Sequence, residues 1–297
     1  MNRLFPRIFL LFLSIALAVT VHPAGAVDAP KEGILLAPFG TTVPEAMGAY
    51  TDMEQTFKAE FPGSPVEWAY TSQIIRSKLE KQGRPVGGVS DGLAALAARG
   101  VKVVRVQSLH IMAGEEFAEL ARAVLIDVQR NPGRFNAVYL GRPLLESRQD
   151  ALEAAAALVG DTKKADDESL VLMGHGQSQG RADLIFEGVR AVFREIDPRF
   201  FMATAEGTRN FDRLLRDLKS GKIRRVRLQA LMFVAGEHAR NDLAGDEKDS
   251  WASRLKAAGF QIKTDLRGLG EMDGIRRIFA RHAKESDDNL TKEPKKL

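Results

Sequence analysis

The stretch that decides the fold is Val104-Arg-Val-Gln-Ser-Leu-His-Ile-Met-Ala-Gly-Glu-Glu116, which aligns without a gap with Val226-Arg-Leu-Gln-Ala-Leu-Met-Phe-Val-Ala-Gly-Glu-His238. Seven of the thirteen positions are identical, and most of the others exchange one apolar residue for another. Two unrelated strands would share Val and Leu by chance, but hardly Gln, Arg and Ala-Gly-Glu as well. A weaker match pairs residues 36–40 with residues 172–176. The sequence therefore predicts two homologous halves.

Within each half, apolar runs typical of strands alternate with helical patterns. The expected strands cover residues 33–38, 66–70, 101–109 and 137–141, then 170–173, 201–205, 226–233 and 261–266. The expected helices cover residues 44–61, 72–82, 92–99 and 115–129, then 181–196, 211–219 and 249–258. Thr42 is expected near the first N-cap and Pro44 in the first turn. This alternation predicts an α/β fold of two Rossmann-like, doubly wound domains with parallel sheets, and a site in the cleft between them.

The composition excludes several kinds of chemistry. The 297 residues are 44% hydrophobic and 28% charged, which argues against a disordered chain and against a protein with many membrane spans. There is no cysteine, so thiolate metal sites, disulfides and cysteine nucleophiles are excluded. Any metal chemistry must therefore use carboxylates and the five histidines.

The first 26 residues have the three parts of a secretory signal peptide. A basic start precedes an apolar run over residues 8–21 and then Ala24-Gly25-Ala26, which predicts cleavage near Ala26. We expect export to the periplasm with no stable membrane anchor after cleavage; the alternative is an uncleaved anchor. Cleavage removes Arg3 and Arg7 and lowers the net charge from +4 to +2, too little to indicate a nucleic-acid partner. The expected organisation is a signal peptide (1–26), an N-terminal half (27–160), a C-terminal half with the metal site (161–285) and a charged tail (286–297).

Three residues that can bind a metal follow strands of the second half. His175 lies between two glycines after the strand at 170–173, Glu206 follows the strand at 201–205, and His238 follows the strand at 226–233. Because the ends of parallel strands share one edge of a sheet, we expect these side chains to meet there. Two imidazoles and a carboxylate bind a divalent transition metal and leave coordination positions open. The alternative for each residue alone is a structural role in a turn.

The duplication supports a functional role for this set. In the first half the matching positions are Phe39, approximately Ser72, and Glu116, so the first copy lacks the three ligands. A purely structural role would be expected in both copies. We therefore predict a metal site in the second half only.

Other residues are candidates for binding a substrate in the cleft. His110, followed by Glu115 and Glu116, ends a strand of the first half and could face the cleft from the opposite wall. The alternative for His110 is a hydrogen-bonded structural histidine. The backbone N–H groups of Phe39-Gly40-Thr41-Thr42 could hold a carboxylate. This loop lacks the Gly-Lys-Ser/Thr element of a P-loop, so we expect no nucleotide.

Two further features carry expectations about position. His282 lies on the last helix, where we expect it to be exposed and without a role in the site. An acidic stretch after His238 comprises Asp242, Asp246, Glu247 and Asp249. A helix N-cap accounts for part of this stretch, and a path that attracts metal cations is the alternative.

Taken together, these motifs resemble those of a known family. The matching motifs are Ala37-Pro38-Phe39-Gly40-Thr41, Gln107-Ser108-Leu109-His110-Ile111, Gly114-Glu115-Glu116, Met173-Gly174-His175-Gly176, Glu206-Gly207, Ala235-Gly236-Glu237-His238-Ala239 and Asn241-Asp242-Leu243-Ala244-Gly245-Asp246 before Trp251. They resemble the anaerobic-type sirohydrochlorin cobaltochelatases, the CbiK family of class II chelatases, over about residues 33–281. The resemblance implies two Rossmann-like domains with a tetrapyrrole between them and the metal on His175, Glu206 and His238. It also implies that the helix at residues 146–158 packs on the other domain.

The activity that the resemblance implies is ATP-independent insertion of Co²⁺, the substrate metal, into sirohydrochlorin. The macrocycle would lie in the cleft with its carboxylates near basic and loop N–H groups, distorted so that its nitrogens face the ion. Two N–H protons must leave, and we assign His175 as their acceptor because imidazoles titrate near neutral pH. The ligand set accepts Co²⁺, Fe²⁺ and Ni²⁺, so an iron or nickel chelatase is an alternative. A periplasmic metal- or tetrapyrrole-binding protein, or the binding component of a transporter, is another.

The predicted export resembles the periplasmic subgroup of this family. Members of this subgroup are associated with a homotetramer and with haem, so a homo-oligomer is an open expectation. His22 would leave with the signal peptide, and no histidine then precedes His110. The lack of an additional axial ligand argues against haem binding.

Overall fold

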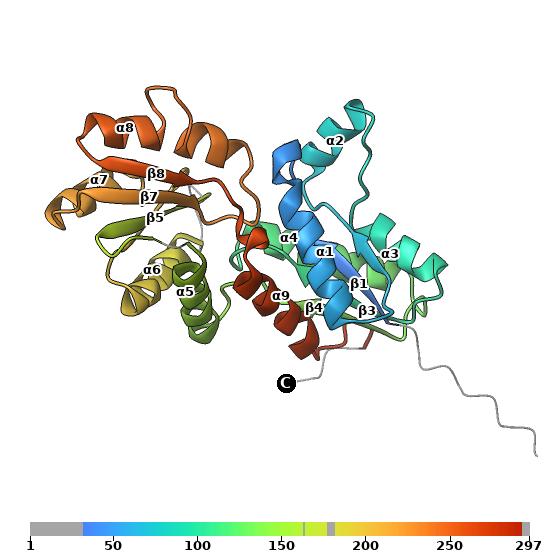
Figure 1. The fold of residues 1–297 in the computed structure, drawn as a ribbon. Helices are drawn as coiled ribbons and strands as arrows, with labels where there is room; N and C mark the ends of the chain where they lie inside the picture. Colours follow the sequence, from blue (N-terminus) through green and yellow to red (C-terminus); the bar gives the residue numbers. More distant parts are fainter. Residues whose placement is uncertain (1–31, 163, 177–181, 293–297) are drawn as a thin grey trace, which may run out of the picture.

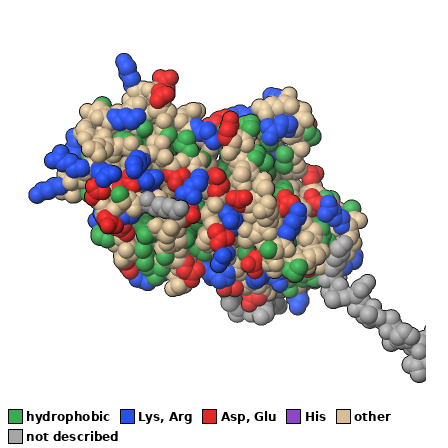
Figure 2. All heavy atoms as spheres, in the orientation of Figure 1, with side chains coloured by type: hydrophobic (Ala, Val, Ile, Leu, Met, Phe, Trp, Pro, Cys, Tyr) green, Lys and Arg blue, Asp and Glu red, His purple; other side chains and the backbone are tan. Residues whose placement is uncertain are grey.

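The structure, a computed structural model, describes residues 32–162, 164–176 and 182–292. The predicted signal peptide at residues 1–26 lies outside these ranges, as does the end of the expected tail, residues 293–297. Among the described residues, no helix combines the length and the hydrophobicity needed to cross a bilayer. On the face shown in Figure 2, Lys and Arg side chains intermix with Asp and Glu over both halves.

The chain forms two four-stranded parallel sheets of identical topology (Figure 1). The first has the order β2 (Val66–Trp68), β1 (Glu32–Ala37), β3 (Val103–Ser108) and β4 (Ala137–Gly141). The second has the order β6 (Phe200–Thr204), β5 (Glu168–Gly174), β7 (Arg225–Ala230) and β8 (Gln261–Asp265). Every pairing in both sheets is parallel. The predicted α/β fold with two doubly wound halves is therefore confirmed.

Helices connect successive strands and cover both faces of each sheet. In the first half they are α1 (Gly48–Glu60), α2 (Gln73–Lys81), α3 (Val89–Ala98) and α4 (Glu115–Arg130). They continue with α5 (Arg148–Thr162), α6 (Ala182–Ile196), α7 (Phe211–Ser220), α8 (Trp251–Ala257) and α9 (Asp273–Glu285). Short helices of other types lie at Pro44–Met47 and Leu269–Glu271 (3-10) and at Ala239–Leu243 (π).

Of two local expectations about helix starts, one is confirmed and one is wrong. Thr42 lies next to the N-cap before Pro44, which is Val43, and the Val43 N–H donates to Thr41 Oγ1 at 3.1 Å. Pro44 occupies the first turn as expected, because a residue there has no helical partner for the N–H that proline lacks. The helix expected over residues 249–258 begins at Trp251, and its cap is the hydroxyl of Ser250, which accepts from the Ser253 N–H. None of the nearby acidic residues therefore caps α8.

The hydrophobic core has three parts. One lies on the outer face of the first sheet, with Leu35 and Val106, and a second on the outer face of the other sheet, with Val171 and Leu228. The third joins the inner faces of the two sheets into one continuous cluster, from Leu36 in β1 to residues of β5 and β6. The two halves therefore share one core and are not separate globules.

The halves exchange their last helices across this shared core (Figure 1). Helix α5 follows β4 of the first half but packs on α6 of the second, as the resemblance implies. Helix α9 follows β8 of the second half but packs on β3, β4 and α1 of the first. Arg105 in β3 fixes the end of α9 by donating to the carbonyl oxygen of Ala283 at 2.8 Å. The chain beyond α9 stays with the first half, since the Leu290 N–H donates to the Val138 carbonyl at 2.9 Å.

His282 is fully buried, which contradicts the expectation that it is exposed. It lies where α9 meets α5, and its Nε2 donates to Oδ1 of the fully buried Asp150 at 2.9 Å. Arg281 also donates to Asp150 Oδ1, at 2.8 Å. Burial lowers the pKa of His282. Burial opposes a charged Asp150, but the hydrogen bonds from Arg281 and His282 outweigh it and lower the pKa of this carboxyl. His282 therefore joins the two exchanged helices.

Candidate functional site

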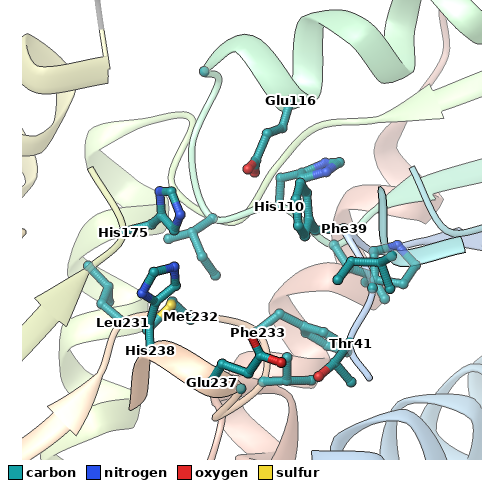
Figure 3. Close-up of a pocket in the computed structure, with 18 of the residues that line it drawn as sticks. Phe39, Thr41, His110, Glu116, His175, Leu231, Met232, Phe233, Glu237 and His238 are labelled. Carbon is teal, nitrogen blue, oxygen red and sulfur yellow. The ribbon is translucent and has the colours of Figure 1, made fainter. Parts of the chain in front are cut away.

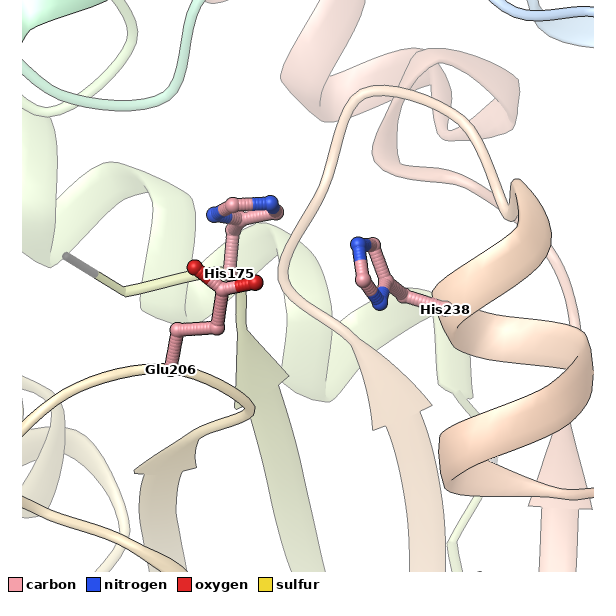
Figure 4. A group of neighbouring side chains, drawn as sticks. All are labelled: His175, Glu206 and His238. Carbon is pink, nitrogen blue, oxygen red and sulfur yellow. The ribbon is translucent and has the colours of Figure 1, made fainter. Parts of the chain in front are cut away.

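The structure brings His175, Glu206 and His238 together, as the strand ends predict (Figure 4). One ligand atom from each lies within 4.8 Å of the other two, which is close enough for a single ion. His175 directly follows β5, and Glu206 lies two residues after β6. His238 does not lie at a strand end, because β7 stops at Ala230 and not at Phe233. It is instead the residue before the π helix, which brings it back to the other two.

The backbone between His175 and Glu206 explains why a glycine follows the histidine. The Glu206 N–H donates to the His175 carbonyl at 2.8 Å, so the chain after β5 runs directly beside the chain after β6. Gly176 has a φ of +81°, and a Cβ there would lie 1.6 Å from the carbonyl oxygen of Glu206. Any side chain at position 176 would therefore push the two ligands apart.

In both imidazoles Nδ1 has a hydrogen-bond partner within the second half. His175 Nδ1 lies 2.9 Å from the Gly176 carbonyl oxygen, and His238 Nδ1 lies 2.5 Å from Asp242 Oδ2. Carbonyls and carboxylates accept hydrogen bonds, so Nδ1 is the protonated nitrogen in each ring. The lone pair of each Nε2 is left for a metal. The two rings are nearly perpendicular, with centroids 4.9 Å apart.

The loop that carries Glu206 is anchored by a buried arginine. Arg209 donates from Nε to Glu187 at 2.6 Å and from Nη1 to Asp217 at 2.7 Å, and thereby ties the loop to α6 and α7. Thr208 adds a third anchor, since its hydroxyl donates to Asp183 Oδ2 at 2.7 Å. These contacts anchor the loop that carries Glu206, while the Glu206 side chain itself stays exposed to solvent.

A cavity of about 280 Å³ lies between the two halves, beside the three ligands (Figure 3). His175 and His238 line one side, while Glu206 lies outside the lining. Much of the remaining wall is apolar or aromatic, including Phe39, Tyr50, Met112, Leu231 and Phe233. Among the described residues that line the cavity, none is Lys or Arg. The expectation that basic groups meet substrate carboxylates therefore does not hold within the cavity itself.

Glu116 faces His175 across the cavity (Figure 3). It lies in the first turn of α4, and burial raises the pKa of its carboxyl, while the nearby His175 acts in the opposite direction. A carboxylate with a raised pKa is a better proton acceptor than an ordinary one. Glu116, which aligns with His238 in the sequence repeat, therefore places a basic group on the wall opposite His175.

His110 lines the cavity, but both of its ring nitrogens are already hydrogen-bonded. Nδ1 lies 2.9 Å from Ser108 Oγ, and Nε2 lies 3.3 Å from Thr71 Oγ1. The side chain is only 4% exposed, and burial lowers its pKa to about 4. This arrangement is that of a hydrogen-bonded strand-end histidine, and a substrate contact by His110 stays a prediction.

The predicted loop Phe39-Gly40-Thr41 lies at the mouth of the same cavity. Phe39 is 43% exposed, and Gly40 has a φ of +110° that brings the loop close to the Tyr70 ring. The adjacent Thr42 hydroxyl approaches Glu237 Oε1 at 3.4 Å, which connects the loop to the second half. Whether its N–H groups hold a carboxylate stays a prediction.

Sequence reasoning missed the roles of Asp242 and Arg209. Asp242 was expected only as part of an acidic stretch, although its spacing of four residues from His238 is typical of side chains on one helical face. Arg209 has no such signal, because its two acidic partners lie on different helices.

The two-lobed parallel α/β fold, with three side chains that could hold a metal ion beside an interlobe cavity, is that of the chelatase architecture. Similar folds are found in "SirB from Bacillus subtilis with Fe3+" (TM-score 0.61, 14% identity, 86% of this chain and 95% of that chain). Another is the sirohydrochlorin chelatase SirB from Bacillus subtilis subspecies spizizenii in complex with cobalt (TM-score 0.55, 15% identity, 86% and 94%). At these identities the likeness concerns the fold alone.

Sequence comparison identifies the family. The profile described as cobalt chelatase (CbiK) matches residues 32–287, so the chain belongs to this family. The chain is 34% identical to sirohydrochlorin cobaltochelatase CbiKC of Nitratidesulfovibrio vulgaris over 265 residues, which are 89% of this chain and 93% of that protein. It is 32% identical to a sirohydrochlorin cobaltochelatase of Salmonella typhimurium over 258 residues, 85% of this chain and 95% of that protein.

Proposed function

We propose that this protein inserts Co²⁺ into sirohydrochlorin without ATP, as a sirohydrochlorin cobaltochelatase. The observation that carries the proposal is the placement of His175 and His238 in one wall of the interlobe cavity, with Glu206 within reach of the same ion. The substrate of the two similar cobaltochelatases is a flat macrocycle, and an apolar cavity between two walls suits its faces.

The three ligands hold the substrate metal without enclosing it. Two imidazole nitrogens and one carboxylate leave several coordination positions open, which the macrocycle nitrogens can fill one after another. Glu206 is exposed and lies outside the cavity lining, which leaves a route for the ion from solvent. The metal can therefore arrive on one side and leave on the other.

Two groups can take the protons that the macrocycle loses. His175 is the acceptor that the sequence predicts, and its Nε2 becomes available once the metal has moved into the ring. Glu116 lies on the opposite wall and has a raised pKa, which suits it to accept a proton from the other face of the macrocycle. We assign the first proton to Glu116 and the second to His175.

The macrocycle carboxylates point out of the cavity in this proposal. The described lining contains acidic side chains such as Glu116 and Glu237 but no Lys or Arg, so carboxylates inside it would be repelled. The apolar pyrrole faces therefore lie inside, and the acidic side chains of the substrate extend to the rim and to solvent.

The proposal is tested with protein that lacks residues 1–26. It is mixed with sirohydrochlorin and Co²⁺, Fe²⁺ or Ni²⁺ in the absence of ATP, and the visible spectrum of the macrocycle is followed. With one equivalent of protein to fifty of substrate, an enzyme converts all of the substrate, whereas a binding protein stops at one equivalent. If the spectrum does not change with any of the three ions, the proposal is overturned. A faster reaction with Fe²⁺ or Ni²⁺ would replace Co²⁺ as the proposed substrate metal.

We also propose that the chain is exported to the periplasm and acts there, on the strength of the predicted signal peptide. Cell fractionation with an antibody, together with the N-terminal sequence of the secreted form, tests this proposal. We expect a mature N-terminus near Val27. An intact N-terminus in the cytoplasmic fraction would contradict it. The homo-oligomer expected from the resemblance is tested by light scattering on the same mature protein.

A further inference from the structure

The two candidate metal-binding histidines differ in what holds their Nδ1 atoms. His175 Nδ1 donates to the carbonyl of the neighbouring Gly176, at 2.9 Å, which is a neutral acceptor. His238 Nδ1 donates to the Asp242 carboxylate at 2.5 Å, which is a charged acceptor at short range. Hydrogen bonds to ionised acceptors are about twice as strong as neutral ones. The ring of His238 is therefore held more firmly than that of His175.

The fold gives the His238–Asp242 pair a defined geometry. His238 directly precedes the π helix Ala239–Leu243, and Asp242 lies within it, so the two side chains project from the same turn. Ala239 and Leu243 of this turn are buried in the core of the second half, which fixes its backbone. The side chains of His238 and Asp242 are 41% and 49% exposed, so the pair lies at the surface of a rigid turn.

We propose that Asp242 is a positioning residue that sets the rotation of the His238 ring, directs Nε2 to the metal and makes His238 the stronger of the two imidazole ligands. The proposal rests on the proposed function, because it requires that His238 binds the substrate metal. A carboxylate behind a metal-bound imidazole raises the basicity of the ligand, and its loss typically weakens metal affinity by about 10- to 100-fold.

Unequal ligands have a consequence for release of the ion. The bond to His175, whose ring is held only by a neutral carbonyl, breaks first, while His238 keeps the metal at the wall of the cavity. The metal then passes to the macrocycle in steps and is not lost to solvent. Asp242 thereby acts on the order of release and not only on affinity.

A general attraction of cations is the competing explanation, since Asp242 is one of several acidic residues in this segment. Asp246 provides the matched control, because it lies four residues further on and is also exposed. Asp246→Asn removes the same charge as Asp242→Asn at nearly the same place. A hydrogen bond to His238 is affected only by the change at Asp242.

The experiment compares Asp242→Ala, Asp242→Asn and Asp246→Asn in the mature protein. Co²⁺ is titrated into each, and the visible absorption of the bound ion reports both affinity and coordination geometry. We expect Asp242→Ala to bind Co²⁺ about 10- to 100-fold more weakly, with an altered absorption spectrum. Asp242→Asn keeps an oxygen that accepts the Nδ1–H, so the spectrum should return to that of the wild type with an affinity loss below about 10-fold. Asp246→Asn should behave as the wild type.

Two results would overturn the proposal while leaving the proposed function intact. One is wild-type affinity and spectrum for Asp242→Ala, with insertion activity present. The other is an equal loss for Asp242→Ala and Asp246→Asn with unchanged spectra, which would show attraction by charge alone. A wild-type protein that binds no Co²⁺ would instead remove the metal centre, and this proposal with it. The KM for sirohydrochlorin should be the same in all variants, because Asp242 lies outside the cavity lining.

Discussion

The two halves of this molecule share one sheet topology and, between the loops after their first two strands, the same backbone hydrogen bond, yet only one half carries the candidate metal ligands. The Ser72 N–H donates to the Phe39 carbonyl at 3.1 Å, and the Glu206 N–H donates to the His175 carbonyl at 2.8 Å. Ser72 and Glu206 therefore occupy corresponding positions, as do Phe39 and His175. At these two pairs of positions the candidate ligands differ from their counterparts in side chain and not in backbone, whereas at the third pair the regular helix α4 of the first half is replaced by the π helix after His238.

The first half uses the same positions for other tasks. Ser72 caps α2 by accepting from the Ile75 N–H, and Phe39 lies with its ring at the mouth of the cavity. Glu116, which corresponds to His238 in the sequence repeat, faces the metal site from the opposite wall. One half thus carries the candidate metal ligands, and the other lines the cavity in front of them.

The largest difference between the two halves is expected at the first pair of corresponding positions, His175 and Phe39. His175→Ala removes a direct ligand and should lower Co²⁺ affinity and the insertion rate by more than about 100-fold, beyond the loss expected for a residue that only supports a ligand. The matched control is Phe39→Ala at the corresponding position of the first half, which should leave Co²⁺ affinity unchanged. Metal titration and insertion assays measure both. Equal losses in the two variants would contradict a metal site confined to the second half.

The second pair of positions tests the carboxylate. Glu206→Gln keeps the shape of the side chain and an oxygen that can still bind the ion but removes the charge, so Co²⁺ affinity should fall by at least about 10-fold, the smallest loss typical of a residue that only supports a ligand. Its control is Ser72→Ala, which should bind Co²⁺ as the wild type does. Calorimetric titration of both variants gives the affinities. An unchanged affinity in Glu206→Gln would remove this residue from the ligand set.

The sequence repeat aligns His110 with Met232, so His110→Met gives the first half the residue of the second. The wild-type histidine has its pKa lowered to about 4 by burial, below the ordinary value of 6.5. The unfolded chain therefore takes up a proton as the pH falls below about 6.5, and the folded protein does not until about 4, so stability is lost across this window.

Between pH 7 and pH 5 the wild type should lose about 2 kcal/mol more unfolding free energy than His110→Met. Urea unfolding at the two pH values measures the difference, and the contribution of His282 cancels because it is present in both proteins. If the unfolding free energies of the wild type and His110→Met change equally between the two pH values, His110 is not held neutral in the folded protein. The absolute stability of the variant is a separate quantity, since Ser108 and Thr71 lose a partner.

The smallest expected effect concerns the capping role that Ser72 has in place of a ligand. Ser72→Ala leaves the Ile75 N–H without its cap and should lower the unfolding free energy by about 1 kcal/mol. Thermal unfolding of the variant measures the loss. If Ser72→Ala lost Co²⁺ binding without losing stability, the roles assigned to Ser72 and Glu206 would be wrong.

The sequence predicts the scaffold well because strands of a parallel sheet are short, apolar and separated by helices. It misplaces the end of β7, since Leu231 and Phe233 continue the apolar run but are buried in the core between the halves and not in the sheet. A run of buried residues does not say which surface covers it. The π helix that carries Asp242 is also missed, because its five residues are too few to show a clear hydrophobic period.

The candidate site was predictable in its ligands and less so in its surroundings. His175 and Glu206 follow strands, so topology alone brings them to one edge. His238 was expected after a strand that in fact ends at Ala230, and it reaches the other two through a loop whose course depends on packing. The burial of His282 could not be predicted, because it arises from helix α9 crossing to the other half.

The exchange of α5 and α9 has a mechanical consequence for the cleft. Each lobe is braced by a helix that the other lobe supplies, and the buried His282–Asp150 pair fastens the two braces together. Such a frame resists the bending by which hinged proteins close around a ligand. The width of the cleft is then fixed before the macrocycle arrives, so we expect the distortion needed for metal insertion to occur in the macrocycle and not in the protein.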